Sequence, residues 1–231
     1  LVRYAPPGGA VLAFNEEAVL AADSNFFEFF AFPLREGNPA TALRGAGKVV
    51  LSPEAARKYF GDGPAIGRVL ELGEERRAVE VSGVTEAQPA NRHFHFDFLL
   101  SMPTNPNVEQ MEWSYIWTQM ATYVRLRPGM EAAALEEKLA TAAGQYVAPT
   151  FGRLGMDFEE FTRNKGNWTF YLQPVQDIHL HSAGIGNRLG PVGDATLVRL
   201  LRFIALLILL VAVLNFINLA RSEEHTSELQ S

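Results

Sequence analysis

The chain has 231 residues, of which 48% are hydrophobic, 11% aromatic and 20% charged, and its formal net charge is −6 at pH 7. These proportions are ordinary for a folded protein, and a mildly acidic chain without basic blocks argues against nucleic-acid binding. The chain has no cysteine, which excludes disulfides and thiolate metal sites and leaves the redox compartment open.

The first predicted elements are a strand and an aromatic helix. The short apolar run Val19–Ala22 predicts a buried strand, and Asp23 and Ser24 then offer a helix cap. Closely spaced phenylalanines follow before Pro33 and Gly37 end the element: Phe26, Phe27, Phe29, Phe30 and Phe32. Such a cluster can form a ligand cage, but we expect these rings to fill the core.

A second strand and helix follow. Lys48–Leu51 is another apolar run, and Ser52 and Pro53 then provide a capping side chain and the proline that favours a first helical position. Gly61 is suited to end this helix. The glycines of residues 61–67 follow a helix, whereas a phosphate-binding loop precedes one, so we interpret them as a turn.

Residues 68–102 have a β pattern. A charged turn at residues 73–77 lies between two apolar runs and predicts a hairpin. Residues 93–98 alternate, with the phenylalanines on one face and His93 and His95 on the other. Two such histidines could bind zinc, but no third ligand is visible nearby and an exposed strand face explains them equally well.

The same alternation recurs at His179 and His181, with the same two interpretations. Between the two histidine pairs, residues 121–126 and 168–172 are predicted as strands, and residues 131–147 as an amphipathic helix. Residues 152–166 look irregular. Strand, helix and strand together predict one βαβ unit with a right-handed crossover.

The most distinctive stretch is residues 197–220. A membrane-spanning helix needs about 20 mostly apolar residues to cross ~30 Å of hydrocarbon, and residues 203–214 contain no polar side chain. Only Arg202, Asn215 and Asn218 interrupt the span from residue 200 onward. The alternative is a buried core helix of a soluble protein, but such helices rarely run this long without an amphipathic face.

No catalytic constellation is visible. The chain has no cysteine nucleophile, no Gly-x-Ser-x-Gly elbow, no His-Glu-x-x-His motif and no Walker sequence. We therefore expect no enzyme activity, and no catalytic, cofactor-binding or metal site.

Several stretches resemble the MacB-like periplasmic core domain and the FtsX-like permease subunits of ABC transporters. These stretches are residues 25–37, 49–52, 56–61, 66–67, 81–84, 122–126 and 215–220. The resemblance extends over most of the chain between residues 19 and 220, and its motifs are structural rather than catalytic.

The resemblance implies an α+β fold, with a porter-like βαβ part and a small β-rich part outside the cytoplasm, followed by one transmembrane helix. The boundaries we expect are 1–61 for the first porter-like part, 62–105 for the β-rich subdomain, 106–193 for the second porter-like part and 194–220 for the helix. In such permeases further membrane helices lie before and after this region.

The last segment, residues 221–231, resembles the in-frame translation of a sequencing-library adapter. We expect it to be an artefact rather than part of the natural protein, and exclude it from the interpretation of the fold. The chain also begins at Leu1 rather than at a methionine. Because an artefact at residues 221–231 would replace the natural sequence, we expect the natural protein to continue beyond Ala220. Because the first residue is not methionine, we expect it to start before Leu1.

The resemblance also implies a function. The chain would be a permease subunit in the bacterial inner membrane, with the residues before about 194 extracytoplasmic. Its partners would be a cytoplasmic ATPase, a second permease copy, the lipid bilayer and a periplasmic adaptor, with no nucleic acid. Two alternatives stay open: a ligand-sensing domain of a membrane receptor, and a regulator of cell-wall hydrolases.

Overall fold

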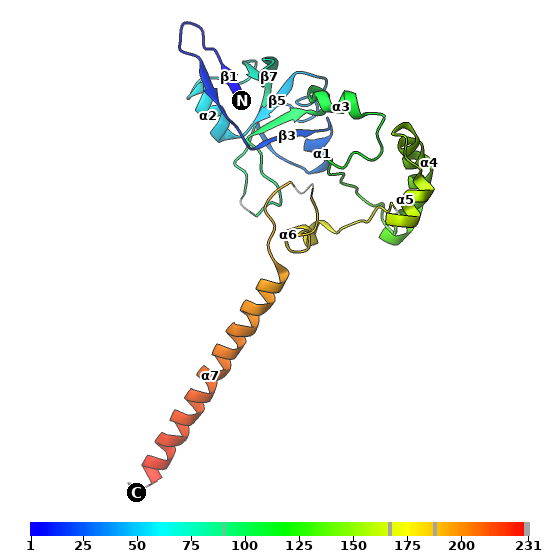
Figure 1. Cartoon of the computed structure of the whole chain (residues 1–231). Helices are drawn as coiled ribbons and strands as arrows, with labels where there is room; N and C mark the ends of the chain where they lie inside the picture. The colour runs from blue at the N-terminus through cyan, green and yellow to red at the C-terminus, as the bar shows by residue number, and fades with distance from the viewer. Residues whose placement is uncertain (90, 166–167, 187–188, 229–231) are drawn as a thin grey trace. The chain divides into compact units, whose positions relative to one another are not determined.

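The computed structural model describes residues 1–89, 91–165, 168–186 and 189–228. It divides into two compact units, Leu1–Leu172 and Gln173–Ser231. The first unit holds the strands and most of the short helices, and the second holds the long helix that ends the chain (Figure 1).

The first unit is built on one mixed sheet. Its strand order is β2-β1-β6-β7-β5-β8-β3, and β4 pairs with β7 beside this path. The pairs β5–β7 and β3–β8 are parallel and the others are antiparallel. The strands are β1 (Val2–Tyr4), β2 (Leu12–Phe14), β3 (Val19–Ala22), β4 (Leu34–Gly37), β5 (Lys48–Leu51), β6 (Val69–Leu72), β7 (Arg77–Thr85) and β8 (Phe98–Ser101).

The core lies around β5, which is placed between β7 and β8. Val49, Val50 and Leu51 are all 0% exposed, as expected for a continuous apolar run in a strand that is covered on both faces. The helix α2 (Pro53–Phe60) packs on this core with one apolar face. That face consists of Ala55, Ala56 and Tyr59.

The start of α2 confirms the predicted cap. The Ser52 hydroxyl accepts a hydrogen bond from the backbone N–H of Ala55 at 3.1 Å and donates one to Oδ1 of Asp97 at 2.8 Å. Pro53 occupies the first turn, and Gly61 ends the helix with a φ of 62°, a backbone conformation that costs glycine little. Ser52 thus connects the helix to the residue just before β8.

We expect Ser52→Ala to lower the free energy of unfolding by about 1–2 kcal/mol, because it removes both hydrogen bonds of a buried hydroxyl. Urea denaturation of the full chain measures this change. Ser24→Ala is the matched control: Ser24 is exposed, and we expect a change within about 0.5 kcal/mol. Equal losses in the two variants would contradict the role of Ser52.

The phenylalanines form a core cluster, as the sequence predicts. The Phe26 ring lies within 6 Å of the rings of Phe27, Phe30, Phe32, Phe94 and Phe96. The helix that carries it, α1 (Phe26–Phe29), is shorter than expected. Its N-cap is Asn25, which makes no side-chain capping bond, so the cap predicted at Asp23 and Ser24 is wrong.

One strand prediction and one predicted helix end next to this cluster need correction. Phe94, Phe96 and Phe98 are buried on one side, as the alternation predicts, but β8 begins only at Phe98. The carbonyl of Phe96 accepts a hydrogen bond from the side-chain amide of Gln88 at 2.6 Å instead of a strand partner. The residues from Pro33 to Gly37, where we expected the aromatic helix to end, contain the strand β4.

The βαβ unit predicted over residues 121–172 is wrong in the described part of the chain. The helix is present and longer than expected, as α4 (Ala132–Arg153), and α5 (Phe158–Lys165) lies where irregular structure was predicted. Neither 121–126 nor the described residues 168–172 form a strand. The domain boundaries at residues 61, 105 and 193 stay predictions.

The remaining elements are short, except the last. In the first unit, η1 (Met102–Thr104) and α3 (Pro106–Met111) lead away from β8. In the second unit, η2 (Val175–Asp177) and α6 (Ile178–His181) precede α7 (Ala195–Glu228), which is drawn in orange and red in Figure 1.

Candidate functional site

The histidines at residues 93 and 95 are engaged in local contacts. Nε2 of His93 lies 2.8 Å from the hydroxyl of Tyr123, and partial burial lowers the pKa of His93. Nε2 of His95 lies 3.5 Å from Oδ1 of Asp97. In the described residues no group of three or more histidine, aspartate or glutamate side chains is placed to hold a metal ion.

The second histidine pair lies in α6, not on a strand. Nδ1 of His181 is 3.9 Å from Oδ1 of Asp177, one helical turn away. The backbone carbonyl of His179 accepts a hydrogen bond from the N–H of Gly193 at 2.7 Å. The pair therefore belongs to the connection between α6 and α7.

The helix α7 supplies the apolar span that the sequence predicts. Its segment Ala195–Leu219 has 25 residues and is, by length and composition, able to cross a membrane, and none of its most apolar window is buried. An exposed surface of this kind is costly in water and favourable in hydrocarbon. This is the feature that a membrane anchor requires.

The N-terminus of α7 is capped by Asp194. Oδ1 of Asp194 accepts hydrogen bonds from the backbone N–H groups of Thr196 at 2.7 Å and Leu197 at 3.4 Å. These bonds favour the charged carboxylate and lower the pKa of Asp194. Nε of Arg199 donates to the carbonyl of Ala195 at 3.2 Å. The polar cap and the arginine mark where the apolar segment begins.

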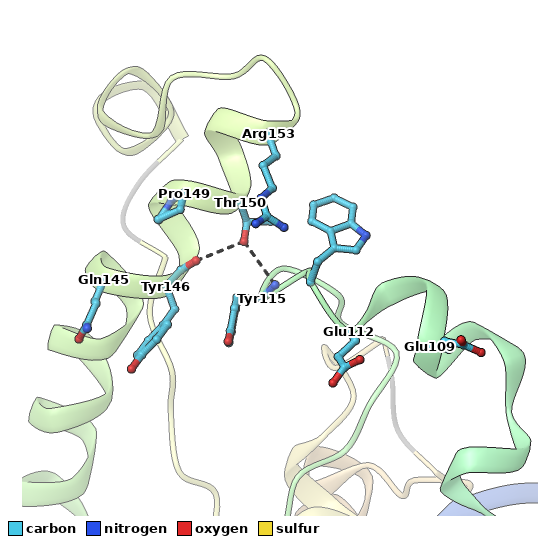
Figure 2. Close-up of a pocket in the computed structure, with 9 residues that line it drawn as sticks. Glu109, Glu112, Tyr115, Gln145, Tyr146, Pro149, Thr150 and Arg153 are labelled. Atoms are coloured by element: carbon cyan, nitrogen blue, oxygen red, sulfur yellow. Dashed lines mark hydrogen bonds between the residues drawn. The ribbon is translucent and has the colours of Figure 1, made fainter. Parts of the chain in front are cut away.

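A second feature is a cavity of about 540 Å³ in the first unit. One wall is the C-terminal half of α4, and the other is formed by the end of α3 and the residues after it (Figure 2). We call it the α3–α4 groove. It is lined by Glu109, Glu112, Trp113, Tyr115, Gln145, Tyr146, Pro149, Thr150 and Arg153.

Thr150 holds the two walls together. Its hydroxyl donates to the carbonyl of Tyr146 at 3.2 Å and accepts the backbone N–H of Tyr115 at 3.4 Å, as the dashed lines in Figure 2 show. The Tyr115 and Tyr146 rings lie 5.2 Å apart between centroids, with an interplanar angle of 32°. The groove therefore has a defined shape at its centre.

A neighbouring face of α4 packs on a small core of its own. Ala143, Val147 and Phe151 are buried against partly buried aromatic and aliphatic side chains. The Phe151 ring lies 4.8 Å from that of Phe161 and 6.2 Å from that of Trp168. This packing orients α4 so that the groove residues face outward.

The charged groups of the groove are available to a ligand. In the described part of the chain, Glu109, Glu112 and Arg153 form no ion pair. Cζ of Arg153 instead lies 5.9 Å from the centre of the Trp113 ring. The sequence did not predict this site. The only local signals were the closely spaced aromatics after α3 and Tyr146 on the predicted helix.

Comparison with solved structures finds domains of membrane transport proteins. A domain of a proposed permease protein from Porphyromonas gingivalis is 28% identical, over 55% of this chain and 58% of that one, with a TM-score of 0.44. The periplasmic region of MacB from Actinobacillus actinomycetemcomitans is 13% identical, over 63% and 64%, with a TM-score of 0.35. The extracellular domain of the noncanonic ABC-type transporter YknZ from Gram-positive bacteria is 20% identical, over 40% and 46%, with a TM-score of 0.29.

The chain thus spans less than two thirds of each of these solved chains. No curated protein matches it. The sequence profile of the MacB-like periplasmic core domain matches residues 2–142, which is more than half of the chain. This span contains the whole sheet and its core. The chain therefore belongs to the MacB-like periplasmic core domain family.

Proposed function

We propose that the chain is the extracytoplasmic domain and one membrane span of an ABC-transporter permease subunit. The observation that carries the proposal is the order of two features along one chain. A MacB-like periplasmic core domain occupies residues 2–142, and the apolar segment Ala195–Leu219 follows it. Because the matching family is a periplasmic domain, we place residues before about 194 outside the cytoplasm and the apolar segment in the bacterial inner membrane.

In this proposal the subunit does not hydrolyse ATP. A separate cytoplasmic ATPase supplies that reaction, and a second permease copy completes the complex. The domain then relays ATP-driven movement of the membrane helices to export, or to events outside the cytoplasm. The absence of a Walker sequence in the chain agrees with this division of labour.

To relay movement from the membrane helix to the domain, the segment that connects them must be stiff. In the connection between α6 and α7, Gly193 N–H donates to the carbonyl of His179 at 2.7 Å, and Ile185 N–H donates to that of Ser182 at 3.0 Å. A Cβ atom at Gly193 would lie 3.0 Å from Cδ2 of Leu180. These contacts support a close connection between α6 and the residues that begin α7.

We expect a longer flexible Gly/Ser linker in place of residues 182–190 to abolish export, while ATPase activity persists. Of this stretch, Asn187 and Arg188 lie outside the described residues. A Gly/Ser chain behaves as a flexible coil and cannot transmit force over the same distance. The measurement compares export with ATP hydrolysis in the complete transporter.

A Gly/Ser replacement of unchanged length is the control for this experiment. It removes the side chains and keeps the span, so we expect an intermediate loss of export. Unchanged export with the longer linker would exclude mechanical relay through this segment. Loss of ATPase activity in both variants would show instead that the segment is needed for assembly of the complex.

A further inference from the structure

We propose that the α3–α4 groove binds an organic cation that has an apolar body. The proposal concerns a site in the first unit and goes beyond the proposed function, because it requires neither an ATPase nor transport. The groove volume of about 540 Å³ lies in the range of about 300–1,000 Å³ that is usual for small-molecule sites.

The aromatic side chains supply the apolar surface. Trp113, Tyr115 and Tyr146 line the groove and are exposed, although large aromatic rings usually gain free energy when they are buried. The faces of such rings carry partial negative charge and attract cations that approach within about 6 Å. The Arg153 guanidinium at 5.9 Å from the Trp113 ring already shows this preference within the protein.

The charges favour a cation over an anion. Glu109 and Glu112 provide two carboxylates without an ion-pair partner among the described residues. Arg153 is the one basic residue lining the groove, and its guanidinium lies against Trp113. The local field is therefore negative. An anionic ligand would meet two carboxylates and compete with the indole ring for the arginine.

The helix α4 lacks one regular backbone hydrogen bond beside the groove. Pro149 lies inside this helix and has no N–H, so it cannot donate to the carbonyl of Gln145 four residues earlier. Gln145 and Pro149 both line the groove. Among organic cations, a protonated amine can in addition donate N–H hydrogen bonds to the Glu109 and Glu112 carboxylates.

The experiment measures binding of benzyltrimethylammonium to the purified full chain in a nonionic detergent by equilibrium dialysis, with protein-free micelles as the blank. Benzyl alcohol and benzenesulfonate are the neutral and anionic probes of similar apolar size. We expect saturable binding of the cation at one site per chain, weakened by added salt. The other two probes should bind at least about twofold more weakly. Benzylamine, a cation with N–H donors, should bind at least as tightly as the quaternary cation.

Variants locate the site. We expect Trp113→Ala to weaken binding about two- to fivefold, and the double variant Glu109→Gln/Glu112→Gln to weaken it at least about twofold. Glu74→Gln is the matched control, because Glu74 is exposed in the turn between β6 and β7, and should bind as the unchanged chain does. Far-ultraviolet circular dichroism checks that each variant is folded.

Equal binding of benzyltrimethylammonium, benzyl alcohol and benzenesulfonate would overturn the proposal, since it would show partition without charge recognition. Cation binding that survives both the Trp113 and the double glutamate substitutions would overturn it as well, because the site would then lie elsewhere. Neither result would affect the proposed transport function. Conversely, failure of the linker experiment would leave the binding result intact.

Discussion

Replacing Leu207 and Leu210 with aspartate is expected to release the chain from the membrane fraction. Both leucines are exposed in the middle of the apolar segment Ala195–Leu219. An aspartate at the centre of a membrane helix costs about 2.5–3.5 kcal/mol, so the pair costs about 5–7 kcal/mol. A single span stabilised by apolar contact with lipid would lose most of its insertion free energy.

The measurement is fractionation of cells that express the full chain, followed by sodium carbonate extraction of the membranes. The unchanged chain should stay in the membrane pellet after extraction. Leu207→Ala/Leu210→Ala is the control, because it shortens the same side chains without adding charge, and we expect it to remain in the pellet. An aspartate variant that resists carbonate as well as this control would rule out a bilayer-spanning role for α7.

The second large effect concerns the phenylalanine core. Phe96 is 0% exposed, and its ring lies 5.4 Å from that of Phe32 and 5.9 Å from that of Phe26. Phe96→Ala would remove these contacts and leave a cavity, which typically costs about 3–5 kcal/mol. Since domains are stable by only about 5–15 kcal/mol, we expect a large fall in the urea midpoint.

His95→Ala is the matched control at the neighbouring position. The His95 side chain is 60% exposed, and we expect its loss to change the free energy of unfolding by about 0.5 kcal/mol or less. Near-ultraviolet circular dichroism of the full chain during urea denaturation follows the tertiary structure of both variants. Similar losses at residues 95 and 96 would contradict the alternating burial of this segment.

Features that depend on neighbours in the sequence could be predicted from the residues alone. The cap at Ser52, the stop at Gly61 and the strand Lys48–Leu51 all appear in the structure where expected. So does the apolar helix. Each depends on a local cause: a side chain that bonds the nearby backbone, a permissive φ angle, or a continuous apolar run.

The strand predictions failed at residues 121–126 and 168–172, which have no strand partner in the described structure. Residues 121–126 have the composition of a strand, yet Tyr123 bonds to His93 at 2.8 Å and its ring packs 5.1 Å from that of Phe30. Residues 168–172 likewise contact a helix side chain instead of a strand: the backbone N–H of Leu172 donates to the Glu136 carboxylate at 2.7 Å. Strand propensity reflects packing against partners, and a single sequence does not specify those partners.

The α3–α4 groove is the clearest case of a feature that only the tertiary structure decided. Its two walls are about 35 residues apart in the chain, as the bond from Tyr115 to Thr150 shows, and no local pattern brings them together. By itself, the sequence determined the cap at Ser52, the core phenylalanines, the apolar helix and the family resemblance. Strand partners and the groove depend on contacts between distant residues, whose free energy arises only when the chain has folded.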